Sequence, residues 1–304
     1  MKDERYYSFS TFCKNTFGRR LYRAALDAGM TCPNRDGRAG TRGCIFCSGK
    51  GSGEFALAYK GQKLSRKDLI WNHRPAQPGD FIAYFQAFTN TYAPAEQLKK
   101  IFTAALCDPL FAGIDIATRP DCLGEDVLAL LRELKEEYPD KFIWIELGLQ
   151  TIHETTADYI RRGYPLAVFD EAVKNLHEIG IPVITHVIIG LPGEDREMIL
   201  ETIRYLNRQK IDGIKLHLLH ILKHTDLAEE YEKGVFTALD EDAYVSILCD
   251  CIAALDPHIV IHRLTGDGDR ENLIAPRWSL DKRHVLNRVR HELAVRDIEQ
   301  GQSM

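Results

Sequence analysis

The chain of 304 residues is long enough for one large domain or two modest ones with a substantial core. Its 45% apolar and 27% charged residues are ordinary for a globular protein, and it contains no run of about 18 apolar residues that could cross a membrane. The net charge of −5 argues against a broad nucleic-acid-binding surface, and the charged start of the chain, which carries no apolar run, predicts a cytoplasmic protein.

Apolar runs alternate with amphipathic stretches along most of the chain. We expect strands at 22–26, 80–85, 113–118, 142–149, 182–189, 213–219 and 258–264, and helices at 94–107, 124–138, 168–179, 195–209 and 240–255. Repeated strand–helix units indicate a parallel sheet, because parallel strands need crossover helices. The pattern predicts an α/β fold, a partial (β/α)6 TIM-type barrel with parallel strands and terminal helical extensions, whose reacting groups lie at the C-terminal ends of the strands.

No repeat or linker divides the chain. We therefore expect a single domain over residues 1–304, with a core at about 17–265 and a C-terminal extension at about 266–304.

A glycine-rich loop follows the first expected strand and holds Cys32, Cys44 and Cys47 in a C-x11-C-x2-C pattern. Three thiolates at these positions could bind zinc or an iron–sulfur cluster. A structural zinc site closes with a fourth ligand, commonly from a second pair of cysteines or histidines, and none stands nearby in the sequence. Three ligands with an open metal position favour a [4Fe-4S] cluster, which Phe46 could shield from water. A zinc-stapled loop stays the alternative.

The other five cysteines are expected to be structural, because disulfides are rare in a reducing compartment. Cys13, Cys107 and Cys122 are isolated and are interpreted as small buried apolar side chains. Cys249 and Cys251 lie in a helical pattern at a spacing that points their side chains about 200° apart, so they cannot share a metal there.

Basic residues gather near both ends of the chain. They are Arg5, Lys14, Arg19, Arg20, Arg23, Arg35, Arg38 and Arg42 in the first part, and Arg277, Lys282, Arg283, Arg288 and Arg290 in the last helix. These residues could form two solvated faces or a rim around a mouth that accepts a polyanion.

The cysteine loop, together with four motifs at strand ends, resembles the radical S-adenosylmethionine (SAM) superfamily. Within it, the chain is similar to the YtqA/YhcC-like group, and to the branch that contains the Elongator catalytic subunit and the coproporphyrinogen dehydrogenases. The motifs are Thr118-Arg119-Pro-Asp, Glu146-Leu-Gly-Leu-Gln150-Thr with Arg161-Arg162-Gly-Tyr, His186-Val-Ile-Ile-Gly190-Leu-Pro-Gly, and Lys215-Leu-His-Leu-Leu-His.

The resemblance implies that Cys32, Cys44 and Cys47 bind a [4Fe-4S] cluster whose open iron chelates SAM. It implies that the SAM-contacting residues are Thr118, Arg119, Gln150, Arg162, His186, Gly190 and Lys215, with Arg162 as a fork on the SAM carboxylate and His186 near the ribose. Taken singly, the lysine and histidines could equally be satisfied polar groups at strand ends.

Two departures from the family pattern stand out. The amine-binding glycine-rich run expected after the second core strand is replaced by Tyr84-Phe-Gln-Ala-Phe-Thr-Asn, so Gln86 or Thr89 must substitute for it. At the third strand, Ala117 occupies the place where many relatives carry an acidic residue.

The resemblance implies reductive cleavage of SAM to a 5′-deoxyadenosyl radical that abstracts hydrogen from carbon, fed by a reducing system such as flavodoxin or ferredoxin. It further implies a transfer RNA (tRNA) substrate, modified on the C5 side chain of the wobble uridine, for example from carboxymethylaminomethyl to aminomethyl. Tyr84, Phe85, Phe88 and Tyr92 could stack on bases, although packing explains at least two of them more simply. The alternatives are a small porphyrin-like substrate or a non-catalytic zinc-binding adaptor.

Overall fold

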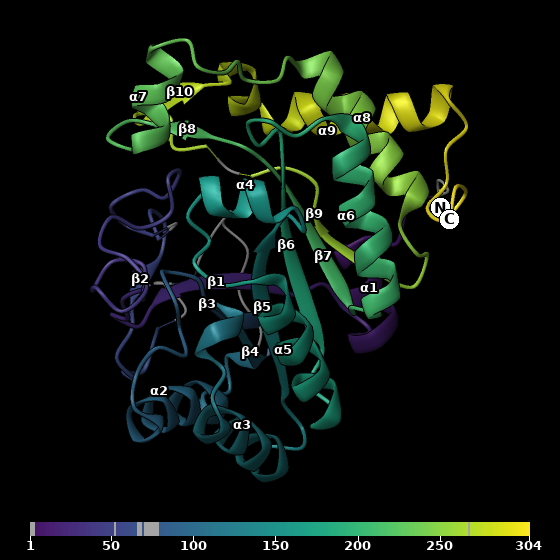
Figure 1. Ribbon diagram of the computed structural model, residues 1–304. Helices are drawn as coiled ribbons and strands as arrows, with labels where there is room; N and C mark the ends of the chain where they lie inside the picture. The colour runs from purple at the N-terminus through teal and green to yellow at the C-terminus, as the bar shows by residue number, and fades with distance from the viewer. Residues whose placement is uncertain (1–3, 52, 66–68, 70–78, 267) are drawn as a thin grey trace.

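In the computed structural model, which describes residues 4–51, 53–65, 69, 79–266 and 268–304, an eight-stranded parallel sheet forms the centre (Figure 1). The strand order is β2-β1-β3-β4-β5-β6-β7-β9, so β2 and β9 are its two edges and the barrel is partial. The bounds are Tyr22–Asp27 for β1, Leu57–Ala58 for β2, Phe81–Phe85 for β3, Phe111–Thr118 for β4, Phe142–Gln150 for β5, Val183–Ile189 for β6, Gly213–Leu218 for β7 and Val260–Arg263 for β9.

Helices cover the outer face of this sheet (Figure 1). Their bounds are Phe9–Phe17 for α1, Ala95–Cys107 for α2, Glu125–Glu137 for α3, Glu154–Tyr159 for α4, Leu166–Glu178 for α5, Arg196–Gln209 for α6, Asp226–Glu232 for α7, Glu241–Ala254 for α8 and Lys282–Val295 for α9. The five helices expected from the sequence are α2, α3, α5, α6 and α8, each within two residues of its expected ends. Their apolar faces pack on the outer side chains of the strands and form the main core. No helix in the described ranges is long and apolar enough to span a membrane.

Side chains of one parity along each strand face the inside of the barrel. At the N-terminal ends of the strands, Ile82, Trp144 and Ile184 form an apolar plug. Helix α1, which the sequence patterns did not predict, closes this end with Phe9 and Phe12. Ser8 caps the first turn of α1 and Gly18, with φ of 69°, ends the helix, so local chemistry fixes both of its ends.

A cap covers the opposite end, where the strands finish. It contains α7 and the antiparallel pair of β8 (Ile221–Leu222) and β10 (Leu273–Ala275), and lies at the top of Figure 1. A second apolar cluster joins the cap to the cysteine loop, with Ile45 from the loop packed beside Leu227 and Ala228. Phe46, expected to shield a cluster, packs against this group. The cap and the cysteine loop thus share one apolar core, separate from the core under the helices.

The structure corrects two readings of single residues. Cys107, expected to be a buried apolar side chain, is exposed because it is the last residue of α2. Arg23, counted as part of a basic rim, points into the barrel from β1 and pairs with Asp115 at 3.1 Å. Cys13, Cys122, Cys249 and Cys251 are buried as expected.

Candidate active site

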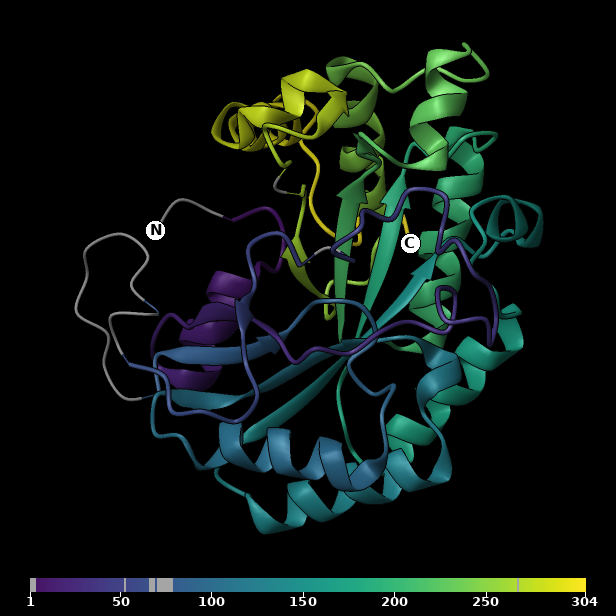
Figure 2. The same ribbon diagram turned by 90° about the vertical axis from the view of Figure 1, so that its left-hand side faces the viewer.

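The cysteine loop lies between β1 and β2 and crosses in front of the strands (Figure 2). Short backbone hydrogen bonds hold its turns: Arg35 donates to the Cys32 carbonyl at 2.8 Å, and Cys47 donates to the Cys44 carbonyl at 3.0 Å. Gly43 has a φ of 77° and donates to the Asn34 carbonyl at 2.7 Å, which closes the loop just before Cys44. The three cysteines therefore lie in a pinned loop at the end of the sheet where barrels place their sites.

The thiols are close enough to affect one another. Burial, together with the neighbouring thiol of Cys47, raises the pKa of Cys44 to about 12. Burial also raises the pKa of Cys47. Desolvated thiols of this kind become thiolates when a metal centre supplies the compensating positive charge.

The three thiols are not grouped as a site for a single metal ion such as zinc. In the described part of the chain, no three His, Cys, Asp or Glu side chains are grouped so that they could hold one metal ion. A tetrahedral zinc ion with Zn–S bonds of about 2.3 Å needs its sulfurs within about 4 Å of one another, whereas a [4Fe-4S] cluster separates its ligands by the width of the cluster. Three neighbouring thiols without a further ligand among the described residues fit a cluster with one open iron.

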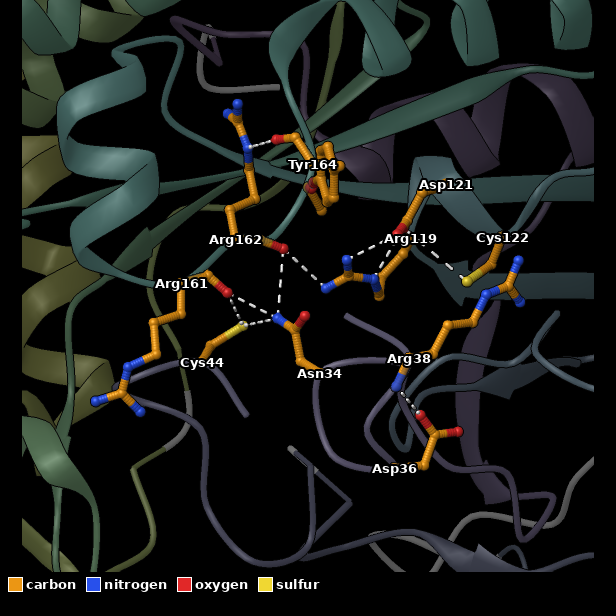
Figure 3. Close-up of polar contacts among 11 residues, drawn as sticks. Asn34, Asp36, Arg38, Cys44, Arg119, Asp121, Cys122, Arg161, Arg162 and Tyr164 are labelled. Atoms are coloured by element: carbon orange, nitrogen blue, oxygen red, sulfur yellow. Dashed lines mark hydrogen bonds and ion pairs between the residues drawn. The ribbon is translucent and has the colours of Figure 1, made fainter. Parts of the chain in front are cut away.

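Asn34 joins this loop to the segment after α4 (Figure 3). Its Nδ2 donates to the Arg161 carbonyl at 2.7 Å and the Arg162 carbonyl at 3.3 Å, and it approaches the Cys44 sulfur at 3.4 Å. Arg119 donates to the same Arg162 carbonyl at 2.9 Å and forms a two-pronged pair with Asp121. The T-R-P-D motif and the cysteine loop therefore meet at one backbone carbonyl.

Arg162 and Thr118, both expected at SAM, are engaged within the protein. The Arg162 guanidinium is 2% exposed and donates to the Thr151 carbonyl at 2.6 Å, the Tyr164 carbonyl at 3.0 Å and Glu154 at 3.0 Å. The Thr118 hydroxyl lies 2.5 Å from that of Thr91. Their contacts with SAM stay predictions.

The other expected SAM residues lie where strands end. Gln86 follows β3 and is half-buried, and Thr89 is buried three residues later, donating to the Thr31 carbonyl at 3.3 Å. Gln150 ends β5 with a φ of 69°, a strained value for a residue with a side chain. Gly190 has a φ of 92°, and a Cβ there would lie 2.9 Å from Leu239, so this turn requires glycine. These roles likewise stay predictions.

A buried ionic cluster occupies the inner face of the sheet between the apolar plug and the cysteine loop. Lys215 donates to Glu146 at 2.5 Å and to the Tyr84 hydroxyl at 3.0 Å. His186 lies 2.7 Å from the same Glu146 oxygen. His186 and Lys215, two sites expected from the resemblance, are thus brought together by one carboxylate on β5.

Two more residues extend this cluster. The Nε of Arg23 pairs with Asp115, and its Nη2 lies 3.7 Å from Glu146 and 2.6 Å from His262. Burial and the charge of Glu146 raise the pKa of Asp115 to about 8. Burial lowers the pKa of Lys215 to about 7, whereas Lys215 and His186 hold the pKa of Glu146 well below its usual range. The pKa values of Asp115 and Lys215 therefore both lie near neutral pH.

Sequence reasoning did not identify Glu146, Asp115, Arg23 or the hydroxyl of Tyr84 as site residues. A signal was present: Asp115 and Glu146 are single carboxylates inside otherwise apolar strands, at the parity that faces the barrel. The pairing of β4 with β5 also bears on Ala117, which stands where many relatives carry an acidic residue. Ala117 lies directly opposite Glu146, so the neighbouring strand supplies a carboxylate beside it.

The prediction that four aromatic residues form a surface for stacking on bases is wrong for two of them. Phe85 is fully buried against Tyr59 and Phe102, and Tyr84 is buried over Lys215. Burial in the core therefore accounts for two of the four aromatic residues, which confirms the simpler interpretation given above. Phe88 and Tyr92 are half-buried and lie beneath arginines of the cysteine loop.

Comparisons with known proteins agree with this site. The family model described as "Radical SAM superfamily" matches residues 36–206, and the one described as "Radical_SAM C-terminal domain" matches residues 211–294. The chain is 43% identical over 301 residues to "Uncharacterized protein YtqA" of Bacillus subtilis, which covers 98% of this chain and 92% of that protein.

Two more distant likenesses concern the Elongator branch. A "tRNA uridine(34) acetyltransferase" of Methanocaldococcus jannaschii is 26% identical over 136 residues, 44% of this chain and 24% of that protein. The solved structure of the archaeal Methanocaldococcus infernus Elp3 with an N-terminal deletion has a TM-score of 0.69 at 15% identity, covering 92% of this chain and 64% of that one, which shows a shared fold. The chain belongs to the radical SAM superfamily, whose cofactors are a [4Fe-4S] cluster and SAM.

Proposed function

We propose that this radical SAM enzyme modifies the C5 side chain of the wobble uridine in tRNA, by abstracting hydrogen from an unreactive carbon. When bound, the cluster and SAM supply the 5′-deoxyadenosyl radical. The chain's own residues hold the cysteine loop rigid, seal the far end of the barrel with the apolar plug, and present the ionic cluster to the space between. An example of such a reaction is conversion of a carboxymethylaminomethyl group to an aminomethyl group, in which SAM would be the net two-electron oxidant and water would release the carboxymethyl group as glyoxylate.

The observation that carries the proposal is the placement of an ionic cluster on the inner face beneath the cysteine loop. A replacement of such buried ion pairs by apolar residues is often neutral or stabilising, so the cluster of Lys215, Glu146, His186, Arg23 and Asp115 is poorly explained by stability alone. It suits a substrate whose reacting part carries charged groups. The tRNA component rests on the likeness to proteins named for acting on tRNA uridine 34.

Exposed cations beside the cysteine loop support a polyanionic substrate. Arg38, Arg42 and Lys50 belong to the loop itself and are exposed, so phosphates bound by them would lie near the mouth. Because the net charge is −5, we infer that the chain contacts phosphates through these few cations rather than through a wide basic surface. We further propose that flavodoxin or ferredoxin supplies the electron.

The experiment is a comparison of modified nucleosides in tRNA. Cells lacking the gene are complemented with the wild-type chain, with Cys44→Ala, or with the matched control Cys249→Ala, and their tRNA nucleosides are quantified by mass spectrometry. We expect the aminomethyl nucleoside to disappear and its carboxymethylaminomethyl precursor to accumulate without the gene and with Cys44→Ala, and to be normal with wild type and Cys249→Ala. Identical nucleoside profiles in all strains, with turnover of a porphyrin-like molecule instead, would overturn the tRNA proposal.

A further inference from the structure

The ionic cluster has an inner and an outer end. Tyr84, Asp115, Glu146 and Lys215 are buried, whereas His186 and His217 are half-buried, and His217 lies two residues nearer the C-terminal end of β7 than Lys215. The two imidazole rings lie 5.0 Å apart with a tilt of 36°. A group that enters the barrel from the C-terminal ends of the strands therefore meets His217 before Lys215, which lies opposite His186.

His217 contains a polar atom that the fold does not satisfy. Its Nε2 is buried and has no hydrogen-bond partner among the described residues. A buried nitrogen left unpaired is destabilising, and this one lies at the accessible edge of the cluster, where an incoming group can pair with it. His217 has no part in the proposed function as described above.

The electrostatic surroundings of His217 indicate the charge of its missing partner. Burial, together with the charges of His186, Arg263 and Lys215, lowers the pKa of His217 well below its ordinary value, while Glu146 opposes this shift. Glu146 is already shared by Lys215 and His186. An anionic group beside His217 would relieve this excess of positive charge, and a carboxylate could accept a hydrogen bond from the ring.

Taking the proposed function as its basis, we propose that His217, with Lys215 and His186, anchors a carboxylate on the side chain of the substrate uridine. The anchor holds the carboxylate toward the sheet, so the neighbouring carbon faces the cysteine loop. His217 and Lys215 are binding residues in this arrangement, and they set which side chain is accepted.

The test uses two anticodon stem-loop RNAs of one sequence, carrying either 5-carboxymethylaminomethyluridine or 5-aminomethyluridine at the wobble position. These probes differ only in the carboxymethyl group. The holoenzyme with SAM bound should prefer the first by about tenfold or more in Kd, the size of one charge-assisted hydrogen bond. His217→Phe and Lys215→Met should each reduce that preference to below about threefold, while His217→Gln, which restores a side-chain amide donor, should recover part of it.

Thr185→Val is the matched control. Thr185 on β6 also carries a buried oxygen without a partner, but it faces the helices on the other side of the sheet. This variant should bind both RNAs as wild type does. Iron content and thermal melting of every variant identify any that fail to fold, and the His217→Gln variant covers a failure of His217→Phe.

The outcomes separate the two proposals. If wild type discriminates between the RNAs and both the His217 and Lys215 variants do so equally well, the anchor is refuted while the proposed function stands. If wild type binds neither RNA more tightly than an unmodified one, the proposed function fails, and the anchor, which rests on it, fails with it.

Discussion

Removal of the side-chain amide of Asn34 should lower the free energy of unfolding. Asn34 is 3% exposed, and its Nδ2 donates to the Arg161 and Arg162 carbonyls. Asn34→Leu keeps the same branched arrangement of side-chain heavy atoms but leaves both carbonyls without this donor. Each of the two lost bonds removes about 1 kcal/mol. The Arg162 carbonyl keeps its bond from Arg119, whereas the Arg161 carbonyl loses its nitrogen donor, so we expect a total loss of about 2–3 kcal/mol in the free energy of unfolding.

The assay is anaerobic urea denaturation of the cluster-free protein, with iron content of the reconstituted protein measured in parallel. Because Asn34 also approaches the Cys44 sulfur, we expect the variant to hold its cluster less firmly. The control is Asn207→Leu, since Asn207 is a half-buried amide that bonds the backbone of Ala254 and Asp256 at the other end of the sheet. It should lower stability without lowering iron content. A loss below about 1 kcal/mol in Asn34→Leu would refute this reasoning.

Three further expectations concern the loop and the inner cluster. Cys44→Ala should abolish reductive SAM cleavage, measured as 5′-deoxyadenosine, whereas Cys249→Ala, in the core of α8, should retain it. Gly163→Ala should destabilise the loop and speed cluster loss in air, because Gly163 has a φ of 81° and the new Cβ would lie 2.6 Å from the side-chain oxygen of Asn34. Asp115→Asn should flatten the pH dependence of stability: the folded-state pKa of Asp115 is raised to about 8, so its contribution is full below pH 3.8 and is lost as the pH rises through 8.

Each of these has a result that contradicts it. Full SAM cleavage by Cys44→Ala would refute its role as a ligand. A Gly163→Ala protein that keeps its iron as long as wild type would show that the loop tolerates the added methyl group. If wild type and Asp115→Asn lose stability in parallel between pH 5 and pH 8 in urea titrations, the raised pKa of Asp115 is refuted.

The sequence was most informative where structure is local. Helices such as α3 were predicted within two residues, because the apolar period of Val127, Leu131 and Leu134 is complete within the helix itself. The cysteine loop was predicted for the same reason, since its spacing lies within 16 residues. Helix α1 was missed although its signal is local, because Phe9, Phe12 and Phe17 repeat at helical spacing between the Ser8 N-cap and Gly18.

The inner cluster could be predicted only in part. His186 and Lys215 were identified through the resemblance, but the carboxylate that joins them depends on strand register. Glu146 meets them because β5 pairs with β6 and β6 with β7, with His186 directly opposite Lys215. Register of this kind is set by packing across the whole sheet, and no short window of sequence contains it. The same holds for Arg23, whose inward direction follows from the parity of β1.

The shared core between cap and cysteine loop has a consequence for biosynthesis. Leu227 donates its backbone N–H to the Ile45 carbonyl at 3.0 Å, and Asp226 pairs with Arg161 and Arg42. The surroundings of the three thiols are therefore completed by a segment made about 180 residues later. Contacts of such long sequence separation form late in folding. During translation, the thiols emerge long before the structure that shields them, so the nascent chain passes through an interval in which its metal-binding loop is open to iron donors and to oxidants alike.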